Sequence, residues 1–263
     1  MKLLKTVRAV AALAIITLGP IFLPATKSVA QTPGLRVFVS NGVKAVIEEL
    51  RPQLEQTVGR PLAIRFDTST ALKRAVDADE PFDVAIFNSD YMDAMVQEQK
   101  VASGSRVDIA RSGLGVGVRA GAPKPDIGTP EAMKRTLLQA NGIAYPGGGA
   151  STPYILKMFA TLGITEQIKS SIRPESNTVV AIARVANGGA DLLVTLLSEI
   201  LPAHEVELVG PLPPQFQSYV TFSAAVGAQT TSLDAARALL RFFGTPAVVP
   251  AFQAQGMESL QKP

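Results

Sequence analysis

The sequence predicts an α/β protein in which mainly parallel sheets are flanked by helices and arranged in two lobes. Three stretches change from a short apolar run to the spacing of an amphipathic helix: 34–50, 62–76 and 82–99. A short polar segment joins strand to helix each time, reading SNG, DTST and NSD. Because parallel strands need crossover connections, usually helices, this repeat predicts βαβ units.

The rest of the chain continues the alternation of strands and helices. A glycine-containing strand and a proline-rich loop occupy 109–127, and Thr129 caps a helix that follows. Further strands and helices are predicted, in chain order, over 142–163, 178–200, 206–227 and 232–257. The last of these ranges reads as two helices, the first capped by Ser232.

Two points on the chain predict how the lobes are connected. The chain leaves the first α/β unit near 111–113 and returns to it near 219–223. The first lobe is therefore expected to comprise 31–111 plus 224–263, and the second 112–223. A ligand cleft is expected between them.

The N-terminal thirty residues read as a secretory signal peptide. Lys2, Lys5 and Arg8 form a basic start, an apolar stretch follows, and small residues precede a cleavage site near Ala30–Gln31. We expect export to the periplasm, with an uncleaved membrane anchor as the alternative.

Composition excludes several classes of function. The chain has 25 basic and 22 acidic residues. Four of the basic residues and none of the acidic ones lie in 1–30, so the remaining 233 residues carry a formal charge of −1. Such a chain has no general basic surface for nucleic acid. With no cysteine and one histidine, disulfides, thiolate metal sites and histidine-rich metal sites are not expected, and we predict a monomer without metal or cofactor.

The strand-to-helix junctions are the candidate ligand-binding features. In a parallel sheet they cluster at the carboxyl ends of the strands, where each following helix begins with unpaired amide N–H groups that attract an anion. The candidates fall in three junctions: Ser40, Asn41 and Gly42; Ser69 and Thr70; Gly149, Ser151 and Thr152. The alternative for each junction alone is an ordinary helix cap.

Five further residues carry open alternatives. Glu199 follows a predicted strand and either faces the cleft or caps a helix. His204 and Tyr154 are the other candidates for proton transfer, although His204 also fits an exposed loop. Arg111 either pairs with a ligand carboxylate or ties the lobes together, and Ser112 lies beside it.

These motifs resemble the extracellular solute-binding proteins of the molybdate-binding type, which have a type II periplasmic binding-protein fold. The resemblance covers nearly all of the chain after the leader and rests on stretches such as FDTSTALKRAV, GGGAST and GGADLLVTLLSEIL. It implies that Ser69 matches a ligand-binding serine, and that Ser151 and Thr178 lie where amides of the second lobe bind the anion. Thr195 stands where molybdate binders have a tyrosine, which argues against molybdate.

Two functions remain in competition. The segments RSGLGVGVRAGAPKPD and SEILP resemble a proteobacterial branch that includes a periplasmic aconitate isomerase. That resemblance implies an enzyme that interconverts cis- and trans-aconitate by proton transfer, needing no cofactor. The alternative is a binding protein that delivers a small carboxylate or oxyanion to an ABC permease, because the same fold serves both functions.

Overall fold

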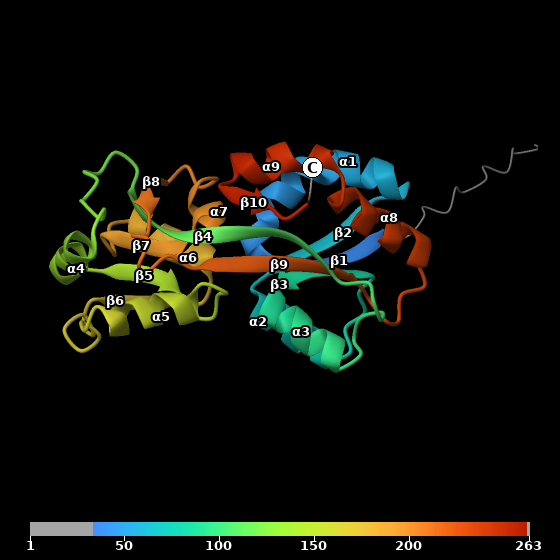
Figure 1. Cartoon of the computed structure of the whole chain (residues 1–263), viewed down its shortest axis with the longest axis horizontal. Coiled ribbons are helices and arrows are strands. Elements are labelled where there is room, and N and C mark those ends of the chain that lie inside the picture. Colours follow the sequence, from blue (N-terminus) through green and yellow to red (C-terminus); the bar gives the residue numbers. More distant parts are fainter. Residues whose placement is uncertain (1–33, 262–263) are drawn as a thin grey trace, which may run out of the picture. The chain divides into compact units, whose positions relative to one another are not determined.

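The computed structural model describes residues 34–261, in which a mixed sheet is covered by helices on both faces (Figure 1). The predicted signal peptide and its cleavage site lie outside the described residues. Within 34–261, no helix has both the length and the apolar character needed to cross a bilayer.

In the described part of the chain, ten strands form one continuous sheet with the order β2-β1-β3-β9-β4-β7-β5-β6, to which β8 and β10 add by pairing with β4. The strands are β1 (Leu35–Ser40), β2 (Leu62–Asp67), β3 (Val84–Asn88), β4 (Val107–Arg119), β5 (Ile143–Pro146), β6 (Ile172–Glu175), β7 (Leu192–Leu196), β8 (Val206–Pro211), β9 (Tyr219–Val226) and β10 (Met257–Ser259).

The predicted βαβ units are present. Strand β1 pairs in parallel with β2 and β3, and β5 pairs in parallel with β6 and β7. The two long central strands differ from the expectation of parallel pairing: β4 and β9 are antiparallel to each other, β9 is antiparallel to β3, and β4 is antiparallel to β7. Strand β9 therefore runs opposite to β1–β3, and β4 runs opposite to β5–β7. Both strands lie between these two groups of parallel strands (Figure 1).

The helices begin close to where the hydrophobic pattern predicts them. They are α1 (Lys44–Val58), α2 (Ser69–Asp77), α3 (Ser89–Gln97), α4 (Pro130–Gln139), α5 (Thr152–Thr161), α6 (Thr178–Ala186), α7 (Leu197–Ile200), α8 (Leu233–Phe243) and α9 (Val249–Ala254), with short 3-10 helices η1 (Asn41–Val43) and η2 (Pro246–Val248). Helices α1, α8 and α9 lie on one side of the β1–β3 strands, and α2 and α3 on the other (Figure 1).

Two predicted helix caps have different outcomes. The Thr129 hydroxyl accepts a hydrogen bond from the Ala132 N–H at 3.2 Å, so Thr129 caps α4 as predicted. Ser232 occupies the cap position of α8, but its side chain makes no capping bond. Its hydroxyl instead accepts a hydrogen bond from Arg60 at 3.1 Å, which ties α8 to the loop before β2.

Strand β4 joins two half-sheets. It pairs with β9 up to Gly113 and with β7 from Leu114 onward. We call the strands β2, β1, β3 and β9 the first half-sheet, and β7, β5, β6 and β8 the second. This exchange of partners lies next to the predicted crossing at 111–113. The lobes 31–111 plus 224–263 and 112–223 stay our proposal for how the chain is divided.

Apolar side chains fill the space on both faces of the sheet. The largest cluster extends through both half-sheets and includes Leu35, Ile86, Val116 and Val194, each 0% exposed. Separate clusters lie under α2 and α3 and under α6. Burial of this apolar surface holds the sheet in place and fixes the strand ends, where the candidate residues lie.

An ion pair between the half-exposed Arg36 and the buried Asp83 fixes the start of β3. The Asp83 carboxylate accepts two hydrogen bonds from the Arg36 guanidinium, at 3.0 and 2.8 Å, and one from the Thr230 hydroxyl at 2.8 Å. Burial acts to raise the pKa of Asp83, but the hydrogen bonds from Arg36 and Thr230 outweigh it and lower that pKa. The pair therefore links β1, β3 and the segment before α8.

We predict that Asp83→Asn destabilises the protein, because it removes the negative charge while Arg36 and Thr230 stay in place. The expected loss is about 2–3 kcal/mol in the free energy of unfolding, measured by urea denaturation at pH 7. A lowered folded-state pKa means that Asp83 stabilises the fold above its unfolded pKa and loses this effect as pH falls. The gap between wild type and variant should therefore shrink below about pH 4; a gap independent of pH would contradict this account.

Candidate functional site

Two hydroxyl-to-carbonyl hydrogen bonds connect the two half-sheets at the ends of their strands. The Ser198 hydroxyl, on α7, donates to the Gly42 carbonyl of η1 at 2.7 Å. The Thr70 hydroxyl, on α2, donates to the Gly148 carbonyl in the loop before α5 at 3.0 Å. The first junction therefore faces α7, and the second faces the GGGAST loop. Junctions that are far apart in the sequence meet in space.

A pocket of about 220 Å³ opens between the half-sheets and contains three of the predicted site residues. Asn41 comes from η1, Thr178 from the start of α6, and Glu199 from α7. Lys44 of α1 and Ser198 also line it. We call this space the inter-half pocket.

Glu199 is the ionisable residue that the second half-sheet contributes to this pocket, whereas α1 contributes Lys44 and Glu48. The Thr178 hydroxyl donates to Oε1 at 2.8 Å, and the Thr195 hydroxyl donates to Oε2. Burial raises the pKa of Glu199, and hydrogen bonds from Thr195, Thr178 and the Leu196 N–H only partly offset it. A raised pKa of this kind occurs at many functional sites and keeps Glu199 a candidate for proton transfer.

The position of Glu199 also bears on the other predicted role, that of a helix-capping residue. Leu196 is the cap residue of α7, and Glu199 is the third residue after it. A carboxyl group at this position matches the acidic residue of a capping box, and the Leu196 backbone acts to lower the pKa of Glu199. Glu199 thus stands near the start of α7 and also lines the inter-half pocket, and its role stays a prediction.

Of the remaining second-half candidates, Ser151 connects to Glu199 through Thr195, whereas Gly149 and Thr152 do not contact it. The Ser151 hydroxyl, 1% exposed, lies 3.5 Å from the Thr195 hydroxyl. The Thr152 hydroxyl donates to the Pro146 carbonyl, and the Gly149 N–H donates to the same carbonyl at 3.3 Å. Gly149 and Thr152 thus shape the loop before α5, while Ser151 continues the row of hydroxyls that begins at Thr178.

In the first half-sheet, the buried Ser40 stands at the end of β1, and the buried Ser69 stands at the start of α2. The Ser69 hydroxyl accepts a hydrogen bond from the Asn88 N–H at 3.3 Å. Thr70 and the Tyr91 hydroxyl share a further hydrogen bond of 2.7 Å. Both serines are therefore held at the carboxyl edge of the parallel strands.

Two predicted residues lie in surroundings that favour other roles. Arg111 is paired with Glu258 of β10 at 2.6 Å and stacks on the Tyr219 ring with its charge 4.5 Å from the ring centre, so it ties β4 to β10 and β9. Ser112 is fully buried, and its hydroxyl accepts the Ser198 N–H at 3.2 Å. It therefore supports the start of α7.

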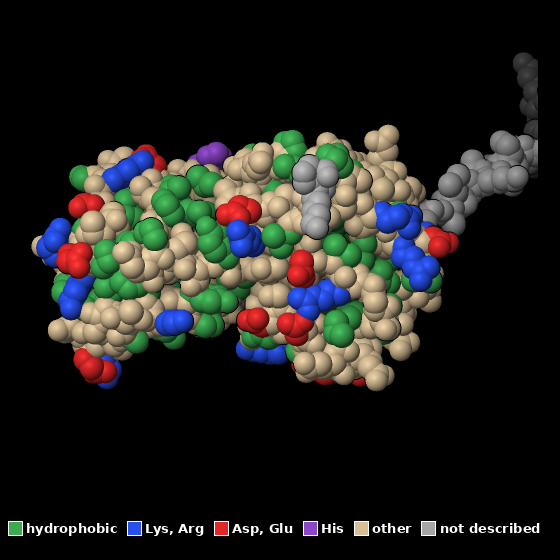
Figure 2. All heavy atoms as spheres, viewed as in Figure 1, with side chains coloured by type: hydrophobic (Ala, Val, Ile, Leu, Met, Phe, Trp, Pro, Cys, Tyr) green, Lys and Arg blue, Asp and Glu red, His purple; other side chains and the backbone are tan. Residues whose placement is uncertain are grey.

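His204 and Tyr154 differ in their surroundings. His204 is exposed in the turn after α7 and is the purple group at the surface in Figure 2. Tyr154 lies partly buried in the first turn of α5, and its pKa is raised first by burial and then by the negative charge of Asp90. Since Asp90 belongs to α3, Tyr154 is close to the first half-sheet, whereas His204 remains on the surface.

Sequence reasoning did not select Asn88, Ser198, Tyr91 or Lys44. The NSD junction at the end of β3 stands out as a polar joint, but its asparagine has no role assigned from the sequence. Ser198 and Tyr91 give no sequence signal, because their partners Gly42 and Thr70 are distant in the chain. Lys44 reads as an ordinary solvated residue on a polar helix face.

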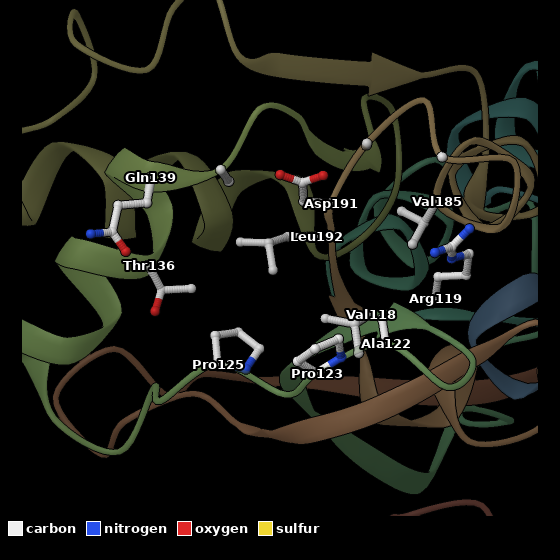
Figure 3. Close-up of a pocket in the computed structure, with 13 residues that line it drawn as sticks. Val118, Arg119, Ala122, Pro123, Pro125, Thr136, Gln139, Val185, Asp191 and Leu192 are labelled. Carbon is white, nitrogen blue, oxygen red and sulfur yellow. The ribbon is translucent and has the colours of Figure 1, made fainter.

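A second pocket, of about 470 Å³, lies elsewhere in the second half-sheet (Figure 3). It is lined by residues such as Arg119, Thr136 and Asp191, and by none of the predicted site residues. The Asp191 carboxylate there already accepts two hydrogen bonds from Asn141. Within 34–261, no group of three or more His, Asp or Glu side chains is placed to hold a metal ion.

The structure thus brings the strand ends of the two half-sheets together around hydroxyl groups and the Glu199 carboxyl group. Residues 35–258 match the model of a family described as bacterial extracellular solute-binding protein. The chain belongs to this family.

Known relatives of the chain include both an enzyme and binding proteins. A Pseudomonas protein named aconitate isomerase is 32% identical over 251 residues, covering 92% of this chain and 95% of that one. The periplasmic molybdate-binding protein of Azotobacter vinelandii has a similar structure, with a TM-score of 0.72 and 19% identity over 87% of this chain and all of that one. The sulfate-binding protein of Mycobacterium tuberculosis has a TM-score of 0.69 and 18% identity, over 87% of this chain and 88% of that one.

We predict that Gly42→Ala weakens the contact between the half-sheets. A Cβ at this position would lie 2.3 Å from the buried Phe222 ring and 3.2 Å from Leu196. The ring has to move, at an expected loss of about 1–3 kcal/mol in unfolding free energy measured by urea denaturation. Gly128→Ala, whose Cβ meets only an ordinary contact at 3.4 Å, is the matched control. Equal stability of the two variants would contradict the tight packing described here.

We predict that Glu199→Gln stabilises the protein at neutral pH. A raised folded-state pKa means that ionised Glu199 opposes folding, so its contribution is favourable below the unfolded pKa and is lost as pH rises through the folded one. Glutamine keeps the size and can still accept the capping bond. The melting temperature of the variant should exceed that of wild type by a few degrees at pH 8 and by less at pH 4. A constant difference across this range would argue against the raised pKa.

Proposed function

We propose that this protein is an isomerase that interconverts cis- and trans-aconitate in the cleft between its half-sheets. The observation that carries the proposal is the Glu199 carboxyl group, which has a raised pKa and lines a pocket shared by both half-sheets. The relative named aconitate isomerase supports the choice of substrate. A binding protein needs donors for its ligand, whereas an isomerase needs in addition a group that moves a proton.

The proposed reaction is an allylic proton shift. Ionised Glu199 removes a proton from the substrate methylene carbon, the double bond moves by one position, and the former vinylic carbon receives a proton. The bond changes balance without oxidant or reductant, and one carboxyl group serves first as base and then as acid. A raised pKa suits both steps better than that of an exposed glutamate.

The substrate carboxylates are expected to bind at the strand ends. Helices α2, α5 and α6 all begin there, and the positive ends of their dipoles attract negative charge. The hydroxyls of Ser40, Ser69 and Ser151, at the strand ends, are expected to donate hydrogen bonds to these carboxylates. Lys44 lines the inter-half pocket but pairs there with Glu48 at 3.8 Å, so the donors expected for a carboxylate are the hydroxyl groups and helix starts. The developing negative charge of the allylic anion would be stabilised by the same donors.

A second function is favoured by one feature of the same site. Glu199 receives its hydrogen bonds from Thr178, Thr195 and the α7 backbone, an arrangement that also suits a purely structural carboxyl group. In that case the protein binds a small carboxylate or oxyanion and delivers it to an ABC permease. The solute-binding family and the molybdate-binding structural relative support this alternative. In both cases we place the protein in the periplasm, exported through a signal peptide cleaved near Ala30–Gln31.

We predict that the purified mature chain converts trans-aconitate to cis-aconitate. Proton NMR in D₂O measures the conversion and should also show deuterium entering the substrate, because the proton on Glu199 exchanges with solvent. Turnover should fall as pH is lowered through the raised pKa of Glu199, since the base must be ionised. Binding of trans-aconitate without conversion would favour the transport function.

We predict that Glu199→Gln reduces the turnover number at least about 100-fold while leaving calorimetric affinity for trans-aconitate within a few fold. Glu205→Gln, which changes an exposed glutamate in the turn after α7, is the matched control and should turn over like wild type. Undiminished turnover in the Glu199 variant would remove Glu199 from the mechanism.

A further inference from the structure

Asn88 is a buried polar residue without a complete set of partners. It is the last residue of β3 and is 5% exposed. Its side-chain oxygen Oδ1 is buried and has no hydrogen-bond partner among the described residues. Buried polar groups are almost always paired, so an exception of this kind calls for an explanation.

Helix capping, the usual role of an asparagine just before a helix, does not explain the unpaired oxygen. Asn88 occupies the cap position of α3, with the extended backbone of a helix cap, yet its side chain makes no capping bond. Thr68 and Asn177 occupy the equivalent positions of α2 and α6, and their side chains do accept the expected bonds from Ala71 and Val180. Asparagine is among the best capping residues. The side chain of Asn88 is therefore not used by its own helix.

Asn88 lies beside residues of the candidate site. Its backbone N–H donates to the Ser69 hydroxyl at 3.3 Å. Ser69 is followed by Thr70, whose hydroxyl reaches the Gly148 carbonyl on the other half-sheet. The backbone of Asn88 is thus held at the junction where the half-sheets meet, which is where an anion is expected to bind.

We propose that Asn88 is a ligand-contacting residue whose side-chain amide hydrogen-bonds a carboxylate of the bound anion beside Ser69. This proposal rests on the proposed function and adds to it a specificity-determining residue. A half-turn about the Cβ–Cγ bond exchanges the carbonyl and NH₂ ends of the amide, so the NH₂ group can point where Oδ1 lies. The NH₂ group of the amide can donate a hydrogen bond to a carboxylate oxygen, and it adds no charge to the site. An unused donor and acceptor in the free site is then part of how the site recognises its ligand.

The test is calorimetric titration of the mature chain with trans-aconitate, using two variants of Asn88. Asn88→Ala removes the amide, and we expect a loss of affinity of at least about tenfold with a melting temperature no lower than that of wild type, because an unpaired buried group disappears. Asn88→Asp keeps the shape and introduces a carboxylate. We expect it to bind at least about a hundredfold more weakly at pH 8, and to recover affinity relative to wild type as pH falls and the introduced carboxylate becomes protonated.

Asn187→Ala and Asn187→Asp are the matched controls, because Asn187 is exposed at the end of α6. Both should bind like wild type. The inference is overturned if Asn88→Ala binds trans-aconitate within about twofold of wild type, or if Asn88→Asp binds equally well at pH 8. Failure of the proposed function looks different, since wild type itself would then give no heat with trans-aconitate or would bind it without converting it.

Discussion

The arrangement of this site depends on two main-chain carbonyl groups, one in each half-sheet. Each accepts a hydrogen bond from a hydroxyl group of the other half-sheet. Gly42 receives Ser198, and Gly148 receives Thr70. Both carbonyls lie at the ends of strands or in the loops that follow, where the regular hydrogen bonding of the sheet stops. Because an unpaired carbonyl is unfavourable once water is excluded, these bonds favour the state in which the half-sheets approach each other.

The approach of the half-sheets has a chemical consequence for Glu199. A carboxyl group on an exposed loop would titrate like one in water, but α7 packs against η1, and burial of Glu199 in these surroundings raises its pKa. Glu199 shares its pocket with Asn41, Lys44 and Glu48 of the other half-sheet. The packing of the half-sheets against each other and the pKa of Glu199 are therefore linked.

The site also shows how one scaffold accommodates binding and catalysis. Helix starts and hydroxyl groups recognise an anion without regard to what happens to it afterwards, which explains why structural relatives that bind molybdate or sulfate have the same architecture. In this chain the hydroxyl of Thr195 donates a hydrogen bond to the Glu199 carboxyl group. The row formed by Thr178, Glu199, Thr195 and Ser151 places an ionisable group within an otherwise neutral set of donors.

The sequence by itself determined the α/β class, the strand-to-helix junctions and the capping of α4 by Thr129. These features depend on local hydrophobic period and on hydrogen bonds within a few residues. It also singled out Glu199, because a carboxyl group three residues after a strand end has few possible environments. Only the tertiary structure decided that β4 and β9 run antiparallel between the half-sheets, that Arg111 pairs with Glu258, and that the Asn88 side-chain oxygen is buried without a partner among the described residues. Each of these depends on segments that are distant in the chain, and the pattern of neighbouring residues carries no information about which distant groups share hydrogen bonds.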